Sequence, residues 1–335
     1  MHANGDALAS ALVIIGFGIG AERDPRDVER NAPTSPTAGS KEARRVQRRR
    51  SGVESTMVLG ITNARSAASP LAVAPLGDVD RAVDAMRWEV VSPWAPVLEK
   101  LSTHPLVARR IQALEESGLP GSPRRWSIAR SLASIVPHDR RAVRRAAAAD
   151  GALAISPWLL LVAAVALGAG MQSRLSTGLA LVTAGGLLLA KQARKYPSDF
   201  APSEVTPLLG RLDASPVAGI PVELRGALIG RADAGNVLSP DLVLQDSTGF
   251  VPLARFSLVP LAGTAFAITK AESLVGNEVV ARGWYRRSPT PIVELRELST
   301  VRGDQSTRTW WWRACWLSSA SVLAAGLLVS LASAF

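Results

Sequence analysis

Two long apolar stretches separated by three residues constrain the fold of this chain more than any other feature. Residues 151–171 contain no charged side chain, and neither do residues 175–190. A helix needs about 20 mostly apolar residues to cross a bilayer, and somewhat fewer where the bilayer is thin. A buried helical hairpin is the alternative, but a run of this length without charge favours the membrane. The pattern therefore predicts a transmembrane hairpin over residues 151–191.

A third apolar stretch lies at the carboxyl end. Residues 314–335 are uncharged, and they follow Trp310, Trp311, Trp312 and Arg313. Tryptophan is enriched at membrane–water interfaces, and a neighbouring arginine can extend its charge to the head groups. We therefore predict a C-terminal transmembrane helix over this stretch, with membrane lipid as a partner.

Positive charge gathers beside the apolar stretches, and the net charge is +10 at pH 7. Because cationic flanks stay on the cytoplasmic side, we expect residues 1–150 and 196–309 in the cytoplasm and the chain in the plasma (inner) membrane. Anionic lipids would then meet the basic flanks. Nucleic acid is another partner for a basic chain, but the cations lie beside the apolar stretches, so we do not expect nucleic acid as a partner. These cations are Arg140, Arg141, Arg144, Arg145, Lys191, Arg194, Lys195, Arg302, Arg308 and Arg313.

The first 150 residues predict a mostly helical region. Residues 5–17 are interpreted as a buried helix, and residues 78–91 carry apolar side chains at helical spacing. Residues 22–54 are rich in Pro, Ser, Arg and Asp, so we expect a disordered loop there. A further helix is predicted to start at the Ser-Thr-His-Pro sequence of residues 102–105, because Pro is tolerated in the first turn.

After the hairpin the pattern becomes that of β-strands. Five segments alternate apolar and polar side chains, and a helix-sized gap at residues 258–275 separates the third from the fourth. This order predicts an OB-like β-barrel over residues 205–300, although other small five-stranded barrels share the pattern. The fold class is therefore a multi-part α+β membrane protein: a helical region, a transmembrane hairpin, the barrel and a C-terminal transmembrane helix.

Trp284, Tyr285, Arg286 and Arg287 are the candidate binding residues of the barrel. OB barrels bind oligonucleotides by stacking bases on aromatic side chains and placing cations near phosphates. The alternative is that Trp284 belongs to the core and the two arginines are solvated at a hairpin tip. We favour this alternative, because one aromatic pair is a small platform.

Motifs for catalysis are lacking in the sequence. The histidines are His2, His104 and His138, and no His-Glu-x-x-His places two zinc ligands one helical turn apart. A phosphate-binding glycine loop and a Gly-x-Ser-x-Gly elbow are also absent from the sequence. The single cysteine, Cys315, permits neither a disulfide within the chain nor a thiolate metal site.

The sequence nevertheless resembles a known family over most of its length outside residues 22–54. Its amino-terminal segments are similar to the later part of the catalytic domain of HtpX-type (CAAX prenyl endopeptidase-like) membrane zinc metallopeptidases. Its barrel segments are similar to a domain that follows the membrane helices in larger members. The segments are residues 4–12, 57–61, 85–88, 92–95, 102–105, 109–114, 242–246 and 283–288.

The resemblance implies hydrolysis of a peptide or protein substrate with Zn²⁺ as cofactor. In the family, zinc is held by His-Glu-x-x-His and by a later glutamate, which would all precede Met1. We interpret this departure as a late start codon or a truncated gene, and expect neither zinc binding nor proteolysis from this chain alone. The resemblance also implies that His104 and Arg110 line the cleft and stabilise the oxyanion. A packing or helix-capping role is the alternative for His104.

Two further functions stay open from the sequence. One is a membrane-anchored OB-like module that binds a protein or a single strand. The other is a non-catalytic pseudo-peptidase subunit that completes a site made by a separate chain.

Overall fold

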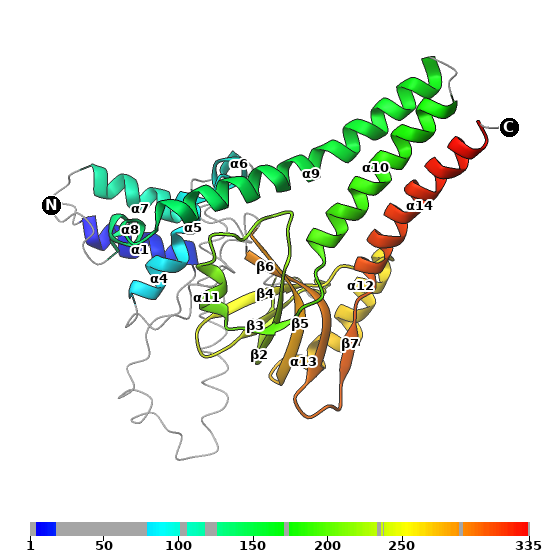
Figure 1. The fold of residues 1–335 in the computed structure, drawn as a ribbon. Coiled ribbons are helices and arrows are strands. Elements are labelled where there is room, and N and C mark those ends of the chain that lie inside the picture. The colour runs from blue at the N-terminus through cyan, green and yellow to red at the C-terminus, as the bar shows by residue number, and fades with distance from the viewer. Residues whose placement is uncertain are drawn as a thin grey trace.

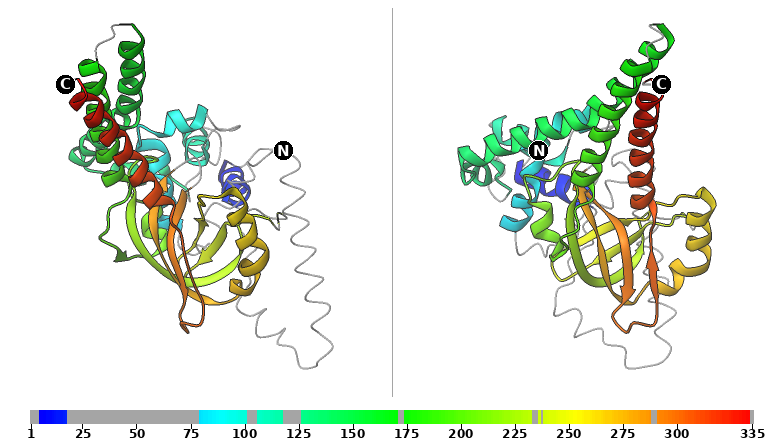
Figure 2. Two further views of the ribbon diagram at one scale, coloured as in Figure 1. Left: turned by 90° about the vertical axis from the view of Figure 1, so that its right-hand side faces the viewer. Right: turned by 45° about the vertical axis from the view of Figure 1, so that its right-hand side comes forward.

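The computed structural model has three parts: a helical region, three long helices and a β-barrel (Figure 1). The helical region and the barrel lie at one end of the long helices, and the carboxyl end of the chain lies at the other (Figure 2). The predicted loop at 22–54 and helix start at 102–105 lie outside the described residues. The structure describes residues 5–17, 79–100, 106–117, 126–170, 174–232, 236, 238–287 and 291–333.

The helical region packs around buried aromatic and aliphatic side chains. Met86, Trp88, Ile111 and Trp126 are each at most 1 % exposed. α8 begins at a serine cap, because the hydroxyl of Ser127 accepts a hydrogen bond from the Arg130 backbone N–H. α1 spans the residues predicted as a helix. The helices are α1 (Gly5–Phe17), α4 (Val79–Met86), α5 (Trp88–Val91), α6 (Ala95–Lys100), α7 (Val107–Glu116) and α8 (Ile128–Ala133).

Three helices of the described residues are long and apolar enough to cross a membrane: α9 (Pro137–Gly170), α10 (Arg174–Lys195) and α14 (Trp311–Leu331). α10 packs against both of the others. α9 begins well before the predicted start at residue 151, so the basic segment and the apolar segment form one helix. The four alanines at residues 146–149 explain this continuity, because alanine has the highest helix propensity.

Glycines allow α10 and α14 to approach closely. A Cβ atom on Gly185 would lie 2.5 Å from the backbone nitrogen of Leu323, and one on Gly326 would lie 2.5 Å from that of Val182. Near the end of α10, the buried Gln192 amide donates a hydrogen bond to Ser319 Oγ at 3.3 Å. Small residues and interhelical hydrogen bonds of this kind are typical of helix pairs within membranes.

Five strands close into a barrel in the order β2–β3–β4–β6–β5, with β5 pairing back to β2. β4 and β6 are parallel, and the other pairs are antiparallel. α12 (Pro260–Phe266), the π-helical turn η2 (Ala267–Ala271) and α13 (Glu272–Leu274) connect β4 to β5. The closure and the helix position fit the predicted OB-like order. The strands are β2 (Ile220–Arg231), β3 (Leu242–Gln245), β4 (Phe250–Ala254), β5 (Glu278–Arg287) and β6 (Pro291–Thr300), with the short β1 (Ala201–Pro202) beside β2 and β7 (Ser306–Arg308) beside β6.

One glycine brings β5 and β6 unusually close just before the end of β5. The pairing shifts by a residue between Arg282 and Gly283. A Cβ atom on Gly283 would overlap the carbonyl oxygen of Glu294, so a side chain does not fit there. α11 (Val205–Leu209) packs against α4 and β4, and thereby joins the helical region to the barrel. The bulge and this contact set the position of residues 284–287.

Candidate functional site at the end of strand β5

The four residues predicted as a binding set lie at the end of β5 and are buried. Trp284, Tyr285, Arg286 and Arg287 are at most 7 % exposed. They therefore do not present an open stacking surface for bases in this structure. The alternative prediction is right about the burial of Trp284 but wrong about the two arginines, because neither of them is solvated.

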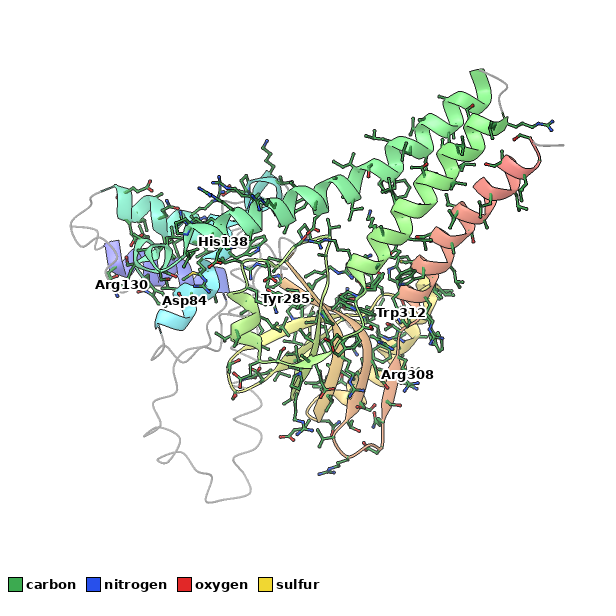
Figure 3. The ribbon with its side chains drawn as sticks, viewed as in Figure 1. Asp84, Arg130, His138, Tyr285, Arg308 and Trp312 are labelled. Carbon is green, nitrogen blue, oxygen red and sulfur yellow. The ribbon has the colours of Figure 1, made fainter. Side chains whose placement is uncertain are left out.

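Strand alternation divides these four residues into two pairs that face different parts of the molecule. Trp284 and Arg286 contact side chains at the end of α10 and the start of α14, where these helices meet the barrel. We call these helix ends the roots of α10 and α14. Arg287 contacts α5, and Tyr285 belongs to the hydrophobic core shared with the helical region. Figure 3 places Tyr285 where the helical region meets the barrel. We call these four residues, with the side chains that contact them, the β5 junction.

Three aromatic rings from the segments at the roots of α10 and α14 lie around Trp284. Its ring centroid lies 4.7 Å from that of Tyr196 in an edge-on arrangement, 5.6 Å from that of Phe200 and 6.0 Å from that of Trp312. Its indole N–H donates to the carbonyl oxygen of Pro197 at 2.7 Å. Tyr196 directly follows α10, and Trp312 is in the first turn of α14 (Figure 3). Trp284 therefore joins two long helices to the barrel wall.

A buried charge lies beside this aromatic group. Arg286 forms an ion pair with Glu294, and the hydroxyl of Tyr196 donates to Glu294 Oε1 at 2.9 Å. Burial lowers the pKa of Arg286 to about 10 and raises the pKa of Tyr196. Arg286 is therefore still charged at neutral pH, and Glu294 supplies the counter-charge that a buried guanidinium requires. The thiol of Cys315 lies 3.7 Å from the Tyr196 hydroxyl.

Further arginines stack on the aromatic residues at the root of α14. The Arg296 guanidinium lies 5.1 Å from the ring centroid of Phe200 and 5.1 Å from that of Trp312. Arg313 lies 4.4 Å from the ring of Trp310. Such cation–π contacts are stronger where water is excluded. These contacts bring positive charge and indole rings together at the root of α14.

On the other face of β5, a buried ion pair joins the barrel to the helical region. Arg287 Nη2 lies 3.1 Å from Glu89 Oε1, and both side chains are less than a tenth exposed. Glu89 Oε2 also accepts the backbone N–H of Ala108 at 3.0 Å, in the first turn of α7. The Arg287 guanidinium lies 5.0 Å from the ring of Trp88, whose indole N–H donates to the carbonyl oxygen of Ala214 at 2.8 Å.

Burial raises the pKa of Glu89, while the neighbouring Arg287 and the Ala108 N–H act in the opposite direction. The carboxylate is thus kept in an apolar place by two specific partners. Removing either partner would leave an uncompensated charge or acceptor in the core. The β5 junction is therefore a rigid connection between three parts of the chain, built from paired charges and stacked rings.

Of the two residues that the family resemblance assigns to the cleft, the structure describes Arg110. His104 lies outside the described residues. Arg110 is on α7, and its Nε is buried without a hydrogen-bond partner among the described residues. Its neighbour Arg109 is paired with Glu99 at 2.8 Å and donates to the carbonyl oxygen of Glu89. The structure therefore gives Arg109 a structural partner, whereas the buried Arg110 Nε has none among the described residues.

An open cleft of about 460 Å³ lies between the first turns of α9 and the connection from α11 to β2. The sequence pattern did not indicate it, because its walls come from segments far apart in the chain. Within it, Arg211 forms two hydrogen bonds with Asp213, at 2.9 and 2.6 Å. Its lining residues are Arg87, Asp139, Ala142, Val143, Ala146, Pro207, Gly210, Arg211, Leu212 and Asp213.

Metal ligands do not converge in the part of the chain that the structure describes. No three His, Cys, Asp or Glu side chains there are grouped so that they could hold a metal ion. The described residues thus do not fit a zinc centre, and we derive no chemical step through one. No protein-family model, curated protein or solved structure matches the chain. The function is therefore inferred from the residues themselves.

Proposed function

We propose that this chain is a multi-pass membrane protein whose three long helices anchor an OB-like barrel and a helical region at one face of the bilayer. The observation that carries the proposal is the exposure of large apolar side chains along these helices. Val162 and Val165 of α9 are 68 % and 72 % exposed, and Leu317 and Leu328 of α14 are 69 % and 67 % exposed. Exposing such surfaces to water is unfavourable in free energy, whereas contact with lipid tails is not.

The ends of the helices support one orientation. The last turn of α9, the first turn of α10 and the last turn of α14 lie at the same end of the bundle (Figure 1). Lys191, Arg194, Lys195 and Arg313 lie at the opposite end, next to the barrel. Because cationic flanks stay in the cytoplasm, the barrel and the helical region face the cytoplasm of a plasma (inner) membrane.

Reporter fusions test this orientation. A reporter joined after Phe335 is expected to be active only if it works outside the cytoplasm. A reporter inserted at Gly303, in the β6–β7 turn, is expected to behave in the opposite way. The chain is also expected to stay in the membrane fraction after alkaline extraction. A cytoplasmic signal from the fusion after Phe335 would refute the orientation.

The role that fits this anchoring is to hold a protein partner or substrate at the membrane surface. The open cleft between α9 and α11 is one surface for this contact. Single-stranded nucleic acid is less well supported as a partner, because Trp284 and Arg286 are committed to the β5 junction.

A specific observation supports the second candidate, the carboxyl-terminal portion of an HtpX-type peptidase. The resemblance joins the segment of α1 to that of α7, and the two helices pack against each other. The Trp126 indole donates to Ser10 Oγ of α1 at 2.9 Å and helps to hold α1 in place. Arg110 keeps a buried Nε without a partner among the described residues, as an anion-binding role requires.

Two measurements test the second candidate. The purified chain with added Zn²⁺ is expected not to cleave casein, and reproducible cleavage that a chelator abolishes would contradict this. The DNA upstream of Met1 is the other observation. An in-frame His-Glu-x-x-His there would support the peptidase family, whereas a nearby stop codon would favour a non-catalytic pseudo-peptidase subunit.

A further inference from the structure

The connection from β4 to α12, together with the first turn of α12, presents a run of apolar side chains to the outside. Phe256, Leu258, Val259 and Leu261 are 41 %, 52 %, 56 % and 77 % exposed. The segment has a fixed shape, because the Arg255 backbone N–H donates to Asp241 Oδ1 at 2.8 Å and the Ser257 hydroxyl donates to the carbonyl oxygen of Val259 at 2.9 Å. A local run of this kind usually marks an interaction surface.

The position of this segment indicates what covers it. The ring of Phe256 lies 6.4 Å from that of Trp311, in the first turn of α14. Figure 2 shows the amino-terminal end of α12 at the level of the root of α14, to one side of the helix. Trp310 and Arg313, at the same root, are stacked on each other. The exposed segment therefore lies beside the aromatic and cationic side chains at the root of α14.

The polarity along the connection from β4 to β5 supports the same location. Its exposed side chains from Phe256 to Leu261 are mainly apolar. Farther along, Ile268 is exposed as well, but the other exposed side chains there, Thr269, Lys270, Glu272 and Ser273, are polar or charged. At the apolar end, the Arg255 guanidinium lies 4.2 Å from the ring of Phe266. An apolar end beside a spanning helix and a polar end away from it is the distribution that a bilayer surface favours.

We propose that residues 256–261 insert into the head-group and acyl boundary of the bilayer beside α14. The inference rests on the proposed anchoring by α9, α10 and α14. Segments of this type enter the boundary by roughly 5–10 Å and are held by their buried apolar area. The barrel is then attached to the membrane at two places, the root of α14 and this segment, so its orientation to the bilayer is fixed.

Fluorescence quenching in vesicles tests the inference with the full chain. In a Cys315→Ser background, single cysteines replace Leu261, Val301 or Leu328 and are labelled with an NBD dye. Val301 is the matched control, because it is 46 % exposed but lies in the β6–β7 turn at the far end of the barrel. The chain is reconstituted in phosphatidylcholine and phosphatidylglycerol vesicles that carry nitroxide lipids, labelled either near the head group or deep in the tail.

The expected result is loss of fluorescence at position 261 with the shallow quencher, loss at 328 with at least one of the two quenchers, and no loss at 301. Quenching at 328 but not at 261 would overturn the inference and leave the anchoring intact. Quenching at 328 alone is the result expected if this segment binds a protein partner and not lipid. Absence of quenching at 328 would overturn the proposed anchoring itself. Quenching at 261 and 301 alike would also overturn the inference, because it would show contact without a preferred face.

Discussion

Replacing Arg287 with methionine is expected to lower the free energy of unfolding by about 3–5 kcal/mol, because it leaves the Glu89 carboxylate buried without its cation. Denaturant titration in detergent, followed by the fluorescence of Trp88 and its neighbours, measures the change. The Arg282→Met variant is the matched control on the same strand. Its partner is Glu223, and this pair is largely in water, so the expected loss is at most about 1 kcal/mol.

The same variant has a predicted pH dependence. Burial already raises the pKa of Glu89 above 4.5, and loss of the nearby Arg287 raises it further. A carboxyl group with a raised folded pKa destabilises the protein fully above that pKa and not at all below its unfolded value. The loss of stability in Arg287→Met is therefore expected to be larger at about pH 8 than at about pH 5.

A double variant separates the charge from the contact. Glu89→Gln keeps an oxygen that accepts the Ala108 N–H, so Glu89→Gln with Arg287→Met removes both buried charges without orphaning the start of α7. We expect most of the lost stability to return. Equal losses in the single and the double variant would show that the ion pair is not what holds the helical region to the barrel.

Gly185→Ala is expected to weaken the contact between α10 and α14 by about 1–3 kcal/mol, because the added methyl group meets the Leu323 backbone. Backbone atoms cannot rotate away as a long side chain can, so the two helices must separate. Thermal unfolding in detergent measures the loss, and disulfide trapping across the helix pair measures the separation.

The neighbouring glycine provides the control for this prediction. A Cβ atom on Gly186 meets nothing within 4 Å, so Gly186→Ala is expected to leave stability unchanged or to raise it by up to about 1 kcal/mol through helix propensity. Equal effects of the two substitutions would mean that α10 and α14 do not pack as the structure shows. Because both variants change the same residue type on the same helix, composition and propensity cancel in the comparison.

The barrel was largely predictable from the sequence because local alternation determines a strand. Five alternating segments were predicted and five strands form the barrel, and the predicted helix-sized gap at residues 258–275 contains α12, η2 and α13. Residues 127–149 have a basic helical pattern that leads into the membrane, but this pattern did not locate the break between α8 and α9.

The site was less predictable, since its contacts join residues far apart in the chain. Burial of Trp284 follows from a strand pattern, but burial of Arg287 depends on Glu89, almost two hundred positions earlier. A signal was present in hindsight: Glu89 and Glu294 each interrupt an otherwise apolar run, WEVV and PIVEL. A lone carboxylate in such a run indicates a buried cationic partner, but not which cation it is.

The continuous helix α9 has a mechanical consequence on the proposed topology. Its 34 residues extend about 50 Å, whereas the apolar core of a bilayer is about 30 Å thick. The part of α9 that exceeds this thickness includes its first turns, where Ala142, Val143 and Ala146 form a wall of the open cleft. Pro157 lacks a backbone N–H, so the helix is most easily bent within the bilayer. On the proposed topology, we expect a change in bilayer thickness that tilts α9 to alter the width of the cleft outside the membrane.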